Sequence, residues 1–175
     1  EPDTVYGLAG VLGRGFEPEF CSFVGTVCHK VGHGLPIQIN DPAVELTLVY
    51  IDDVVNELID AMKGAPNLAS GGYCYIKRKF QINLQSLADT IISFTRARDE
   101  LVVPNLEEDL TRFLYATYTS FYNEDDFGYE LEMKHDDRGW LAEFIKSGQF
   151  GQVFVSRTKP GITRGNHWHH SKIEK

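Results

Sequence analysis

The sequence predicts an α/β fold followed by a β fold, and three observations support this prediction. Before residue 121, several stretches repeat apolar residues every three or four positions, as amphipathic helices do, with short apolar runs between them. From residue 129 onwards, apolar and polar residues alternate, which is typical of half-buried strands. An acidic stretch separates the two patterns. We therefore divide the chain into residues 1–121, a linker at 122–128 and residues 129–175.

The first part of the chain is predicted to begin with a strand at residues 4–12, followed by a glycine-rich loop. Apolar residues then recur at helical spacing from about residue 20 to 31, and glycines end this helix. Two short strands, at 37–39 and 46–51, are predicted to pair after a turn at residues 40–42.

The next helix is predicted to be capped by Asp52 or Asp53. Its apolar residues form one stripe that we expect to be buried: Val54, Val55, Leu58, Ile59 and Met62. A strand is predicted at about 73–80, followed by a helix capped by Asn83 and by a last helix at about 106–120.

After the linker, every predicted element is a strand. Apolar residues alternate at 129–133 and 140–144, on either side of a turn at 136–139, and a further strand includes 153–155. The second part therefore has the pattern of a β-sheet built from hairpins.

The net charge limits the classes of binding partner, and the cysteines indicate the redox state of the compartment. The chain has 17 Lys plus Arg against 25 Asp plus Glu, a net charge of −8, which disfavours nucleic acid or an anionic membrane as its main partner. An anionic substrate therefore needs a local cluster of basic residues. Cys21, Cys28 and Cys74 are odd in number and lie in apolar stretches, which favours reduced core thiols in a cytoplasmic protein. No apolar run approaches the roughly 20 residues that cross a bilayer.

The strongest chemical signal is the spacing of His167, His169 and Glu174. On a strand, residues two apart point to the same face, so the two imidazoles can converge, and a tight turn can return the carboxylate beside them. Two imidazoles and a carboxylate suit Zn, Fe, Mn or Ni with open coordination positions, and we expect zinc. The alternative is a solvated hairpin in which the histidines and Trp168 stack on one another.

Three further residues near these ligands are candidates for substrate binding. Arg164 and Asn166 directly precede the first histidine, and a guanidinium there can grip a phosphate or carboxylate with two hydrogen bonds. His170 points to the opposite face of a regular strand and is predicted either to contact substrate or to support the metal ligands from outside the coordination sphere. An ordinary surface position is the alternative for Arg164.

The C-terminal motifs resemble those of known enzymes. The spacing of glycine, paired histidines and glutamate is similar to the first motif of the cupin barrels. The wider pattern resembles the sugar-nucleotide cupins that epimerise keto-deoxyhexoses, and the matching positions are Asp137-Arg138-Gly139, Glu143-Phe144, Gln152, Ser156, Gly161, Arg164-Gly165 and His167. The resemblance implies that His167 acts as a base on a carbon beside a ketone. One imidazole nitrogen cannot bind a metal and remove a proton at once, so both roles of His167 stay open.

The first part resembles a different family. The stretches from Val5 to Gly13 and from Leu48 to Val54 are similar to the C-terminal, substrate-binding part of extended short-chain dehydrogenases, whose Rossmann part is largely missing here. Followed by half of a cupin jelly-roll, this order resembles the bifunctional capsular-polysaccharide enzymes that make UDP-N-acetyl-L-fucosamine precursors. The resemblance implies epimerisation of a UDP-linked 4-keto-6-deoxy-N-acetylhexosamine, reduction of its ketone with NADPH, and a homodimer.

Two other functions remain open. The metal ligands also suit a different cupin isomerase or an Fe(II) dioxygenase. The cupin segment could instead be a non-catalytic sugar-binding or dimerisation module, because half-barrels expose strand edges. Both chain ends are interpreted as breaks in a longer protein, and we expect the 175-residue chain alone to be inactive.

Overall fold

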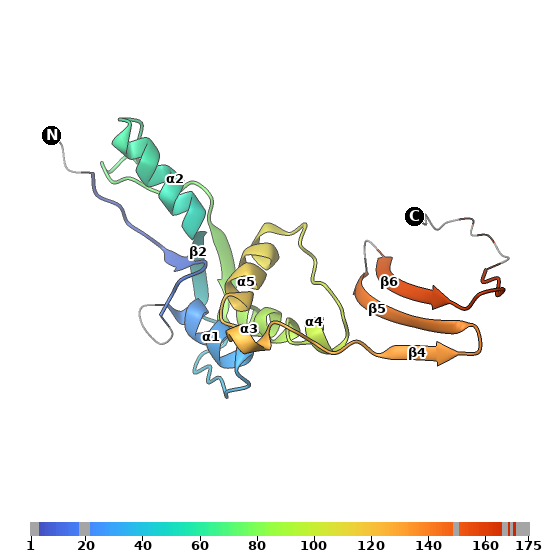
Figure 1. Cartoon of the computed structure of the whole chain (residues 1–175). Coiled ribbons are helices and arrows are strands. Elements are labelled where there is room, and N and C mark those ends of the chain that lie inside the picture. Colours follow the sequence, from blue (N-terminus) through green and yellow to red (C-terminus); the bar gives the residue numbers. More distant parts are fainter. Residues whose placement is uncertain (1–3, 18–21, 149–150, 166–167, 169, 171–175) are drawn as a thin grey trace.

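The computed structural model describes residues 4–17, 22–148, 151–165, 168 and 170. It consists of an α/β unit and a separate three-stranded sheet, connected by the segment that follows helix α5 (Figure 1). The predicted order of an α/β part before a β part is therefore confirmed.

A mixed three-stranded sheet forms the centre of the α/β unit. Strand β1 (Gly10–Leu12) runs parallel to β2 (Glu45–Tyr50), and β2 runs antiparallel to β3 (Phe80–Asn83). The parallel pair requires a crossover, which helix α1 (Phe23–Gly32) supplies. The strand predicted at residues 4–12 is therefore confined to its last three residues, and upstream of it Tyr6 forms an isolated parallel bridge with Cys74.

Two predicted strands in this unit are wrong. Residues 37–39 form no strand, and β2 pairs with β1 and β3 instead of with that segment. Residues 73–79 are irregular apart from the bridge at Cys74, and the strand begins at Phe80. Both predictions rested on the alternation of apolar and polar residues within the segment itself. A strand also needs a partner strand beside it, and that partner comes from a distant part of the chain.

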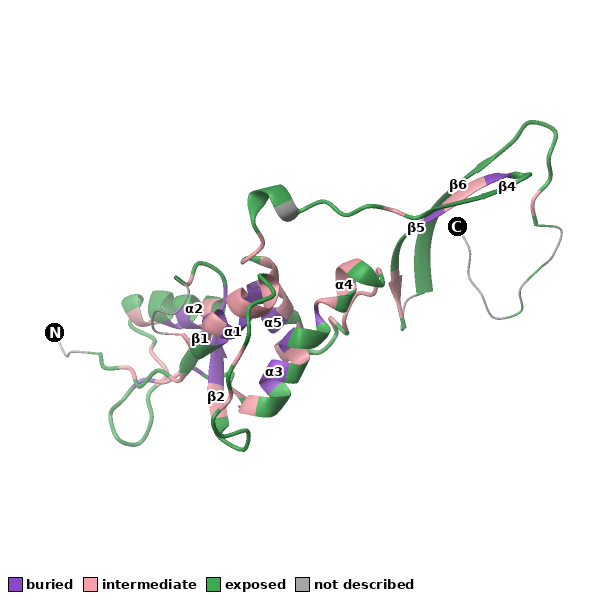
Figure 2. Cartoon of the chain, turned by 90° about the horizontal axis from the view of Figure 1, so that it is seen from below, coloured by how far each residue is buried: buried purple, intermediate pink, exposed green. Residues whose placement is uncertain are grey.

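Helices α1, α3 (Leu84–Ser93) and α5 (Asp109–Thr119) enclose the main core with β1 and β2, and the short helix α4 (Arg96–Asp99) follows α3. Figure 2 shows that most of the buried residues lie in this unit, and a few lie on β5. The buried residues of this core are Leu12, Val24, Val27, Cys28, Leu48, Tyr50, Leu87, Ile91, Phe94, Phe113, Leu114 and Tyr118. Cys28 and Cys74 are buried free thiols, as predicted, whereas Cys21 lies outside the described residues.

Two of the helices begin at side-chain caps. Asn83 Oδ1 accepts a hydrogen bond from Ser86 N at 2.8 Å, which confirms the predicted cap of α3. Ser22 Oγ accepts one from Gly25 N at 3.1 Å at the start of α1. At the end of α1, Gly34 takes a left-handed conformation, with φ of +64°.

Helix α2 (Ile51–Met62) differs from its prediction in two ways. Its N-cap is Tyr50, without a side-chain hydrogen bond, and Asp52 and Asp53 lie inside the first turn. Carboxylates there still stabilise the helix through its dipole. Of the predicted buried stripe, only Val54 is buried, whereas the other four apolar side chains are between 42% and 88% exposed. The stripe is wider than the small cluster formed with Val49 and Ile76 on which α2 packs.

A buried carboxylate holds α2 in place. Glu57 is only 5% exposed, and its Oε1 accepts hydrogen bonds from Tyr6 Oη at 3.0 Å and from Asn67 N at 2.7 Å. Its Oε2 accepts a hydrogen bond from the Asn67 amide nitrogen. Loss of solvation and the neighbouring Glu57 carboxylate raise the pKa of Tyr6 to about 12, so the phenol stays a donor at neutral pH. The helix is thereby attached to both the first segment and the loop after it.

We predict that Glu57→Ala destabilises the chain by about 2 kcal/mol or more, because it removes the acceptor of three donors in a largely buried setting. Urea unfolding followed by circular dichroism measures this change. Asp60→Ala on the same helix is the matched control, since Asp60 is exposed and pairs with the exposed Lys63. Equal unfolding free energies for the two variants would contradict the role of Glu57.

The second unit is an antiparallel sheet in which β5 (Gly139–Ser147) lies between β4 (Met133–Asp136) and β6 (Gly151–Thr158). A 3-10 turn (Glu124–Asp126) lies in the predicted linker, and the predicted alternation at 129–133 becomes strand only at Met133. Both β4 and β6 are exposed throughout their described lengths (Figure 2).

Backbone hydrogen bonds attach the sheet to the α/β unit. Lys146 N donates to Leu101 O at 2.7 Å, and Val103 N donates to Lys146 O at 2.9 Å, so the segment after α4 forms a parallel bridge with β5. Tyr129 Oη also donates to Phe144 O at 3.0 Å. The two units are therefore joined by strand pairing as well as by the chain connection.

Among the described residues, no helix combines the length and apolar character needed to span a membrane.

Candidate functional site

The candidate site begins at the tight turn between β4 and β5. Asp136 Oδ1 accepts hydrogen bonds from the backbone nitrogens of Arg138 at 2.9 Å and Gly139 at 3.0 Å, which explains an aspartate at the start of this turn. Gly139 has a φ of +147°, and a Cβ there would lie 1.8 Å from the carbonyl oxygen of Arg157. Only glycine allows β6 to approach this closely.

Two arginines converge on the same carboxylate. Asp136 Oδ2 accepts from Arg138 Nε at 2.9 Å and Nη2 at 2.6 Å, and Oδ1 accepts from Arg164 Nη2 at 3.1 Å. Arg164 thus comes from beyond β6 to the β4–β5 turn. Its Nε is buried and has no hydrogen-bond partner among the described residues. This arrangement fixes one edge of the guanidinium and leaves a buried donor for another group.

The Arg138 guanidinium, followed by smaller contributions that include Arg164, holds the pKa of Asp136 below its ordinary value of 3.8. A lowered pKa in the folded state means that the stability contribution is complete above the unfolded pKa and is lost as the pH falls through the folded pKa. We therefore predict that the difference in thermal stability between the wild type and Asp136→Asn is largest near neutral pH and shrinks below about pH 4.

Thermal unfolding at a series of pH values measures this difference. Asp137→Asn is the matched control, because the neighbouring carboxylate forms no ion pair among the described residues. A stability difference for Asp136→Asn that does not change with pH would contradict the ion-pair assignment.

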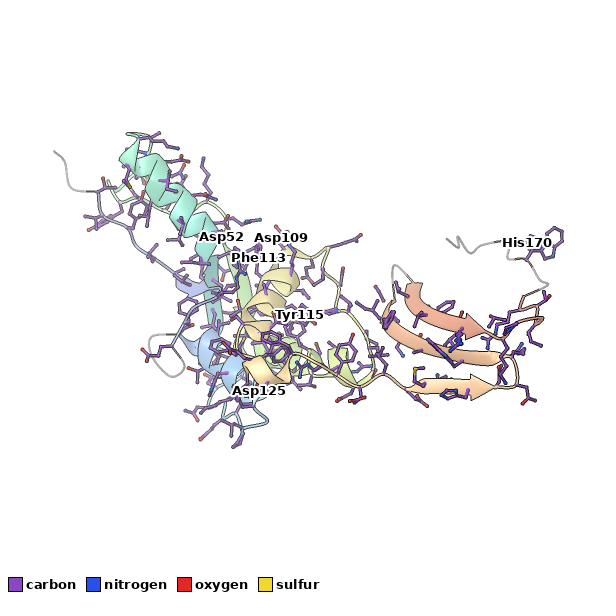
Figure 3. The ribbon with its side chains drawn as sticks, in the orientation of Figure 1. Asp52, Asp109, Phe113, Tyr115, Asp125 and His170 are labelled. Carbon is purple, nitrogen blue, oxygen red and sulfur yellow. The ribbon has the colours of Figure 1, made fainter. Side chains whose placement is uncertain are left out.

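Only two of the predicted site residues are described. Arg164 lies at the turn, with 24% of its side chain exposed, and its ion pair with Asp136 was not predicted from the sequence. His170 is exposed and lies beyond the sheet, away from the α/β unit, with its ring centroid 5.6 Å from that of Trp168 (Figure 3). Four predicted residues lie outside the described residues: Asn166, His167, His169 and Glu174.

Between His167 and Glu174, the structure describes two residues, Trp168 and His170. Trp168 and His170 are not in a strand, so the regular strand expected through His170 is wrong at these two positions. Within the described part of the chain, no three His, Cys, Asp or Glu side chains form a group that could hold a metal ion. The predicted set of His167, His169 and Glu174 remains a prediction, supported by its donor chemistry.

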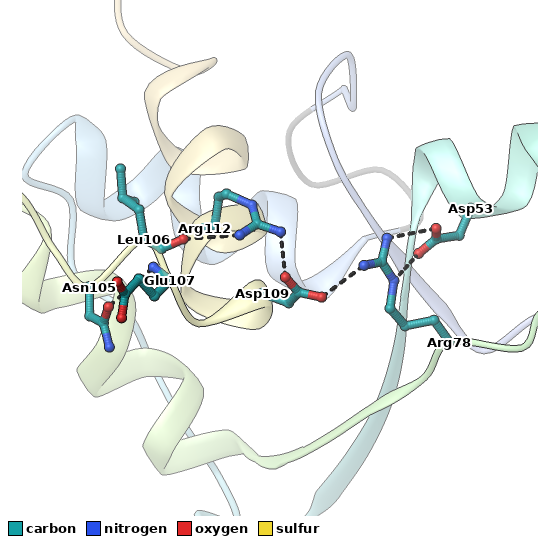
Figure 4. Close-up of polar contacts among 7 residues, drawn as sticks. All are labelled: Asp53, Arg78, Asn105, Leu106, Glu107, Asp109 and Arg112. Atoms are coloured by element: carbon teal, nitrogen blue, oxygen red, sulfur yellow. Dashed lines mark hydrogen bonds and ion pairs between the residues drawn. The ribbon is translucent and has the colours of Figure 1, made fainter.

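A second polar network lies on the α/β unit (Figure 4). Arg78 donates two hydrogen bonds to Asp53, at 2.8 and 2.7 Å, and one to Asp109 at 2.8 Å, and Asp109 is also bound by Arg112. The guanidinium of Arg78 lies 4.8 Å from the ring centroid of Phe113. No local pattern in the sequence indicates this network, because the two carboxylates are 25 and 31 residues away from Arg78.

The network has a structural explanation. The hydrogen bond from Arg112, then that from Arg78, lowers the pKa of Asp109, and Asp53 raises the pKa of Arg78. The two carboxylates and the two guanidiniums of this network are therefore paired with one another, and they connect α2, the segment before β3 and α5. Tyr118 of α5 is a packing residue, because it is buried against Phe94.

Comparisons with known proteins agree with this fold. Residues 134–175 match the family of the polysaccharide biosynthesis C-terminal domain. The chain is 39% identical over 174 residues to a UDP-2-acetamido-2,6-beta-L-arabino-hexul-4-ose reductase of Pseudomonas aeruginosa, a match that covers 99% of this chain and 46% of that protein. The chain thus spans about half the length of this curated relative.

Two crystal structures are similar over nearly the whole chain. One is the capsular polysaccharide assembling protein CapF of Staphylococcus aureus, with a TM-score of 0.88, 39% identity and coverage of 96% of this chain and 45% of that one. The other is CapF with the inhibitor 3-isopropenyl-tropolone, with the same TM-score and identity and 49% of that chain covered. The chain is therefore similar in sequence to a reductase of a UDP-linked hexulose, and similar in sequence and fold to a capsular polysaccharide assembling protein.

Proposed function

We propose that this chain is part of a bifunctional nucleotide-sugar enzyme of capsular polysaccharide synthesis. The observation that carries the proposal is the match of both units together, at 39% identity, to a reductase of a UDP-linked hexulose. A likeness of one unit alone would fit many functions. Here the α/β unit, the junction and the sheet match in one continuous alignment over 99% of the chain.

We assign epimerisation to the C-terminal unit, as the first half of a cupin barrel from residue 129 onwards. The donor set of His167, His169 and Glu174 suits a divalent metal, with zinc as our choice, and leaves positions open for substrate oxygens. A metal held there would polarise the ketone of a UDP-linked 4-keto-6-deoxy-N-acetylhexosamine. This makes the proton on the neighbouring carbon more acidic.

The remaining site residues would position the substrate. A base must remove the proton beside the ketone, and His167 can do so only if it is not a metal ligand at that moment. The proposed substrate contacts are Arg164, Asn166 and His170, and the buried Nε of Arg164 has no hydrogen-bond partner among the described residues. Arg164 is held by Asp136, which keeps its guanidinium oriented.

We assign residues 1–121 to the substrate-binding portion of the reductase, with 122–128 as the linker. NADPH would be bound by a part of the longer protein that this chain does not include. The proposal extends to a cytoplasmic homodimer, in keeping with the buried free thiols of Cys28 and Cys74.

The test uses the longer protein, the UDP-linked 4-keto sugar and NADPH in deuterated water. We expect NADPH to be oxidised, measured by its absorbance, and deuterium to enter the carbon beside the ketone, measured by mass spectrometry of the product. Oxidation without deuterium at that carbon would remove the epimerase from the proposal. Deuterium without oxidation would remove the reductase.

A further inference from the structure

One face of the C-terminal sheet carries a pocket of about 300 Å³ beside the β4–β5 turn. We call it the basic pocket, and its walls include His135, Asp136, Trp140, Arg157 and Lys159. His135 pairs with Trp140 across β4 and β5, and Trp140 pairs with Arg157 across β5 and β6. Directly opposed residues of antiparallel strands share a face, so an imidazole, an indole and a guanidinium form one continuous surface.

The charge of the basic pocket is positive. Its one acid, Asp136, is already bound by Arg138 and Arg164. Neither Arg157 nor Lys159 forms an ion pair with a carboxylate of the described residues. Arg157 and Lys159 therefore make the pocket locally positive, although the chain as a whole has a net charge of −8. The pocket therefore suits an anionic ligand.

The indole of Trp140 favours an anionic ligand that also carries a planar ring. Trp140 is only partly buried, so it offers a flat ring beside the two cations. A guanidinium and an ammonium bind phosphate oxygens, and an aromatic face stacks on a planar base. A volume of about 300 Å³ lies at the lower end of ligand pockets, enough for part of a nucleotide sugar.

We propose that the basic pocket binds the nucleoside diphosphate portion of the substrate, with the phosphates on Arg157 and Lys159 and the base against Trp140. The choice of this ligand rests on the proposed function. The position of the pocket supports it, because Asp136 links the pocket wall to Arg164, a proposed substrate contact. In sequence, His167 follows Arg164 by three residues.

The test is titration of the chain with UDP, pyrophosphate and uridine, followed by calorimetry and by tryptophan fluorescence. The Trp168→Phe background leaves Trp140 as the single indole, because the chain contains two tryptophans. We expect UDP to quench Trp140 and to bind more tightly than pyrophosphate or uridine. Replacing both Arg157 and Lys159 with Gln should weaken UDP binding by about tenfold or more, because two charge-assisted contacts are lost.

Two controls make the result specific. Lys134→Gln makes the same change of charge on β4, at a position that alternation places on the opposite face from His135, and should leave UDP binding unchanged. Trp140→Leu should weaken UDP binding and leave pyrophosphate binding unchanged. If the double variant loses the circular dichroism of the folded chain, the single Gln variants, both at exposed positions, replace it.

Three results would overturn the proposal. The first is the absence of UDP binding, and the second is a UDP affinity of the double variant equal to that of the wild type. The third is a loss of UDP affinity in Lys134→Gln as large as the loss in the double variant. UDP affinity no greater than that of pyrophosphate, together with no effect of Trp140→Leu, would reject nucleotide recognition. These outcomes do not depend on NADPH oxidation or deuterium uptake, so the pocket can fail while the proposed function stands.

Discussion

Replacing His169 with alanine in the longer protein is expected to abolish deuterium uptake beside the ketone and to leave NADPH oxidation with the epimerised substrate intact. The reason is that His169 is proposed to serve only as a metal ligand. Removing partners outside the first coordination sphere costs about 10- to 100-fold in metal affinity, so loss of a direct ligand should cost more than about 100-fold. Without the metal, the ketone is not polarised and the neighbouring proton is not removed.

The control for this variant is His33→Ala, which removes an exposed histidine of the α/β unit. Both activities and the metal content should stay at wild-type levels. If His169→Ala keeps its metal and its deuterium uptake, the metal assignment is wrong. If it instead loses only its ability to dimerise, the C-terminal unit is an assembly module.

Gly139→Ala is expected to destabilise the C-terminal sheet by about 3 kcal/mol or more, since it combines overpacking with backbone strain. The added Cβ would lie 1.8 Å from the Arg157 carbonyl oxygen, and the φ of +147° is one that side-chain-bearing residues rarely adopt. Because the atom in the way is backbone, β6 must move. The same movement would disturb the basic pocket, whose walls come from both strands.

Urea unfolding of the Trp168→Phe chain, monitored by Trp140 fluorescence, measures this effect. Gly148→Ala is the matched control, because a Cβ there would meet no atom within 4 Å. The control should unfold at nearly the wild-type urea concentration. A Gly139→Ala chain as stable as the control would show that β5 and β6 do not approach as described.

The features that the sequence predicted well are those encoded by neighbouring residues. The cap at Asn83 identified the start of α3, and the alternation of apolar and polar residues identified the strand β5. The aspartate turn also follows from local chemistry, because Asp136 binds the nitrogens of the next residues.

The features that were missed depend on distant parts of the chain. The apolar stripe of α2 was expected to be buried, but amphipathic spacing says nothing about whether another element covers the helix. The contact of Arg78 with Asp53 and Asp109 joins three separated segments and has no local signal. The pairing of β5 with the segment around Val102 was likewise invisible, since it requires the two units to lie together.

In the candidate site, too, local features were predicted from the sequence and contacts between distant residues were not. Arg164 was identified by its place before the histidines, but its bond to Asp136, 28 residues earlier, was not. Arg157 and Lys159 were not singled out, because each is an ordinary basic residue in sequence. Their interest comes only from the register that places Arg157 opposite Trp140.

The central claim is that His167, His169 and Glu174 hold one divalent metal ion. Elemental analysis of the purified longer protein, after dialysis against metal-free buffer, tests this claim most directly. We expect about one zinc per chain in the wild type and less than about one tenth of that in the double variant His167→Ala/His169→Ala, because only one of the three ligands remains. A wild type that retains no metal, or a double variant that retains as much as the wild type, would contradict the account.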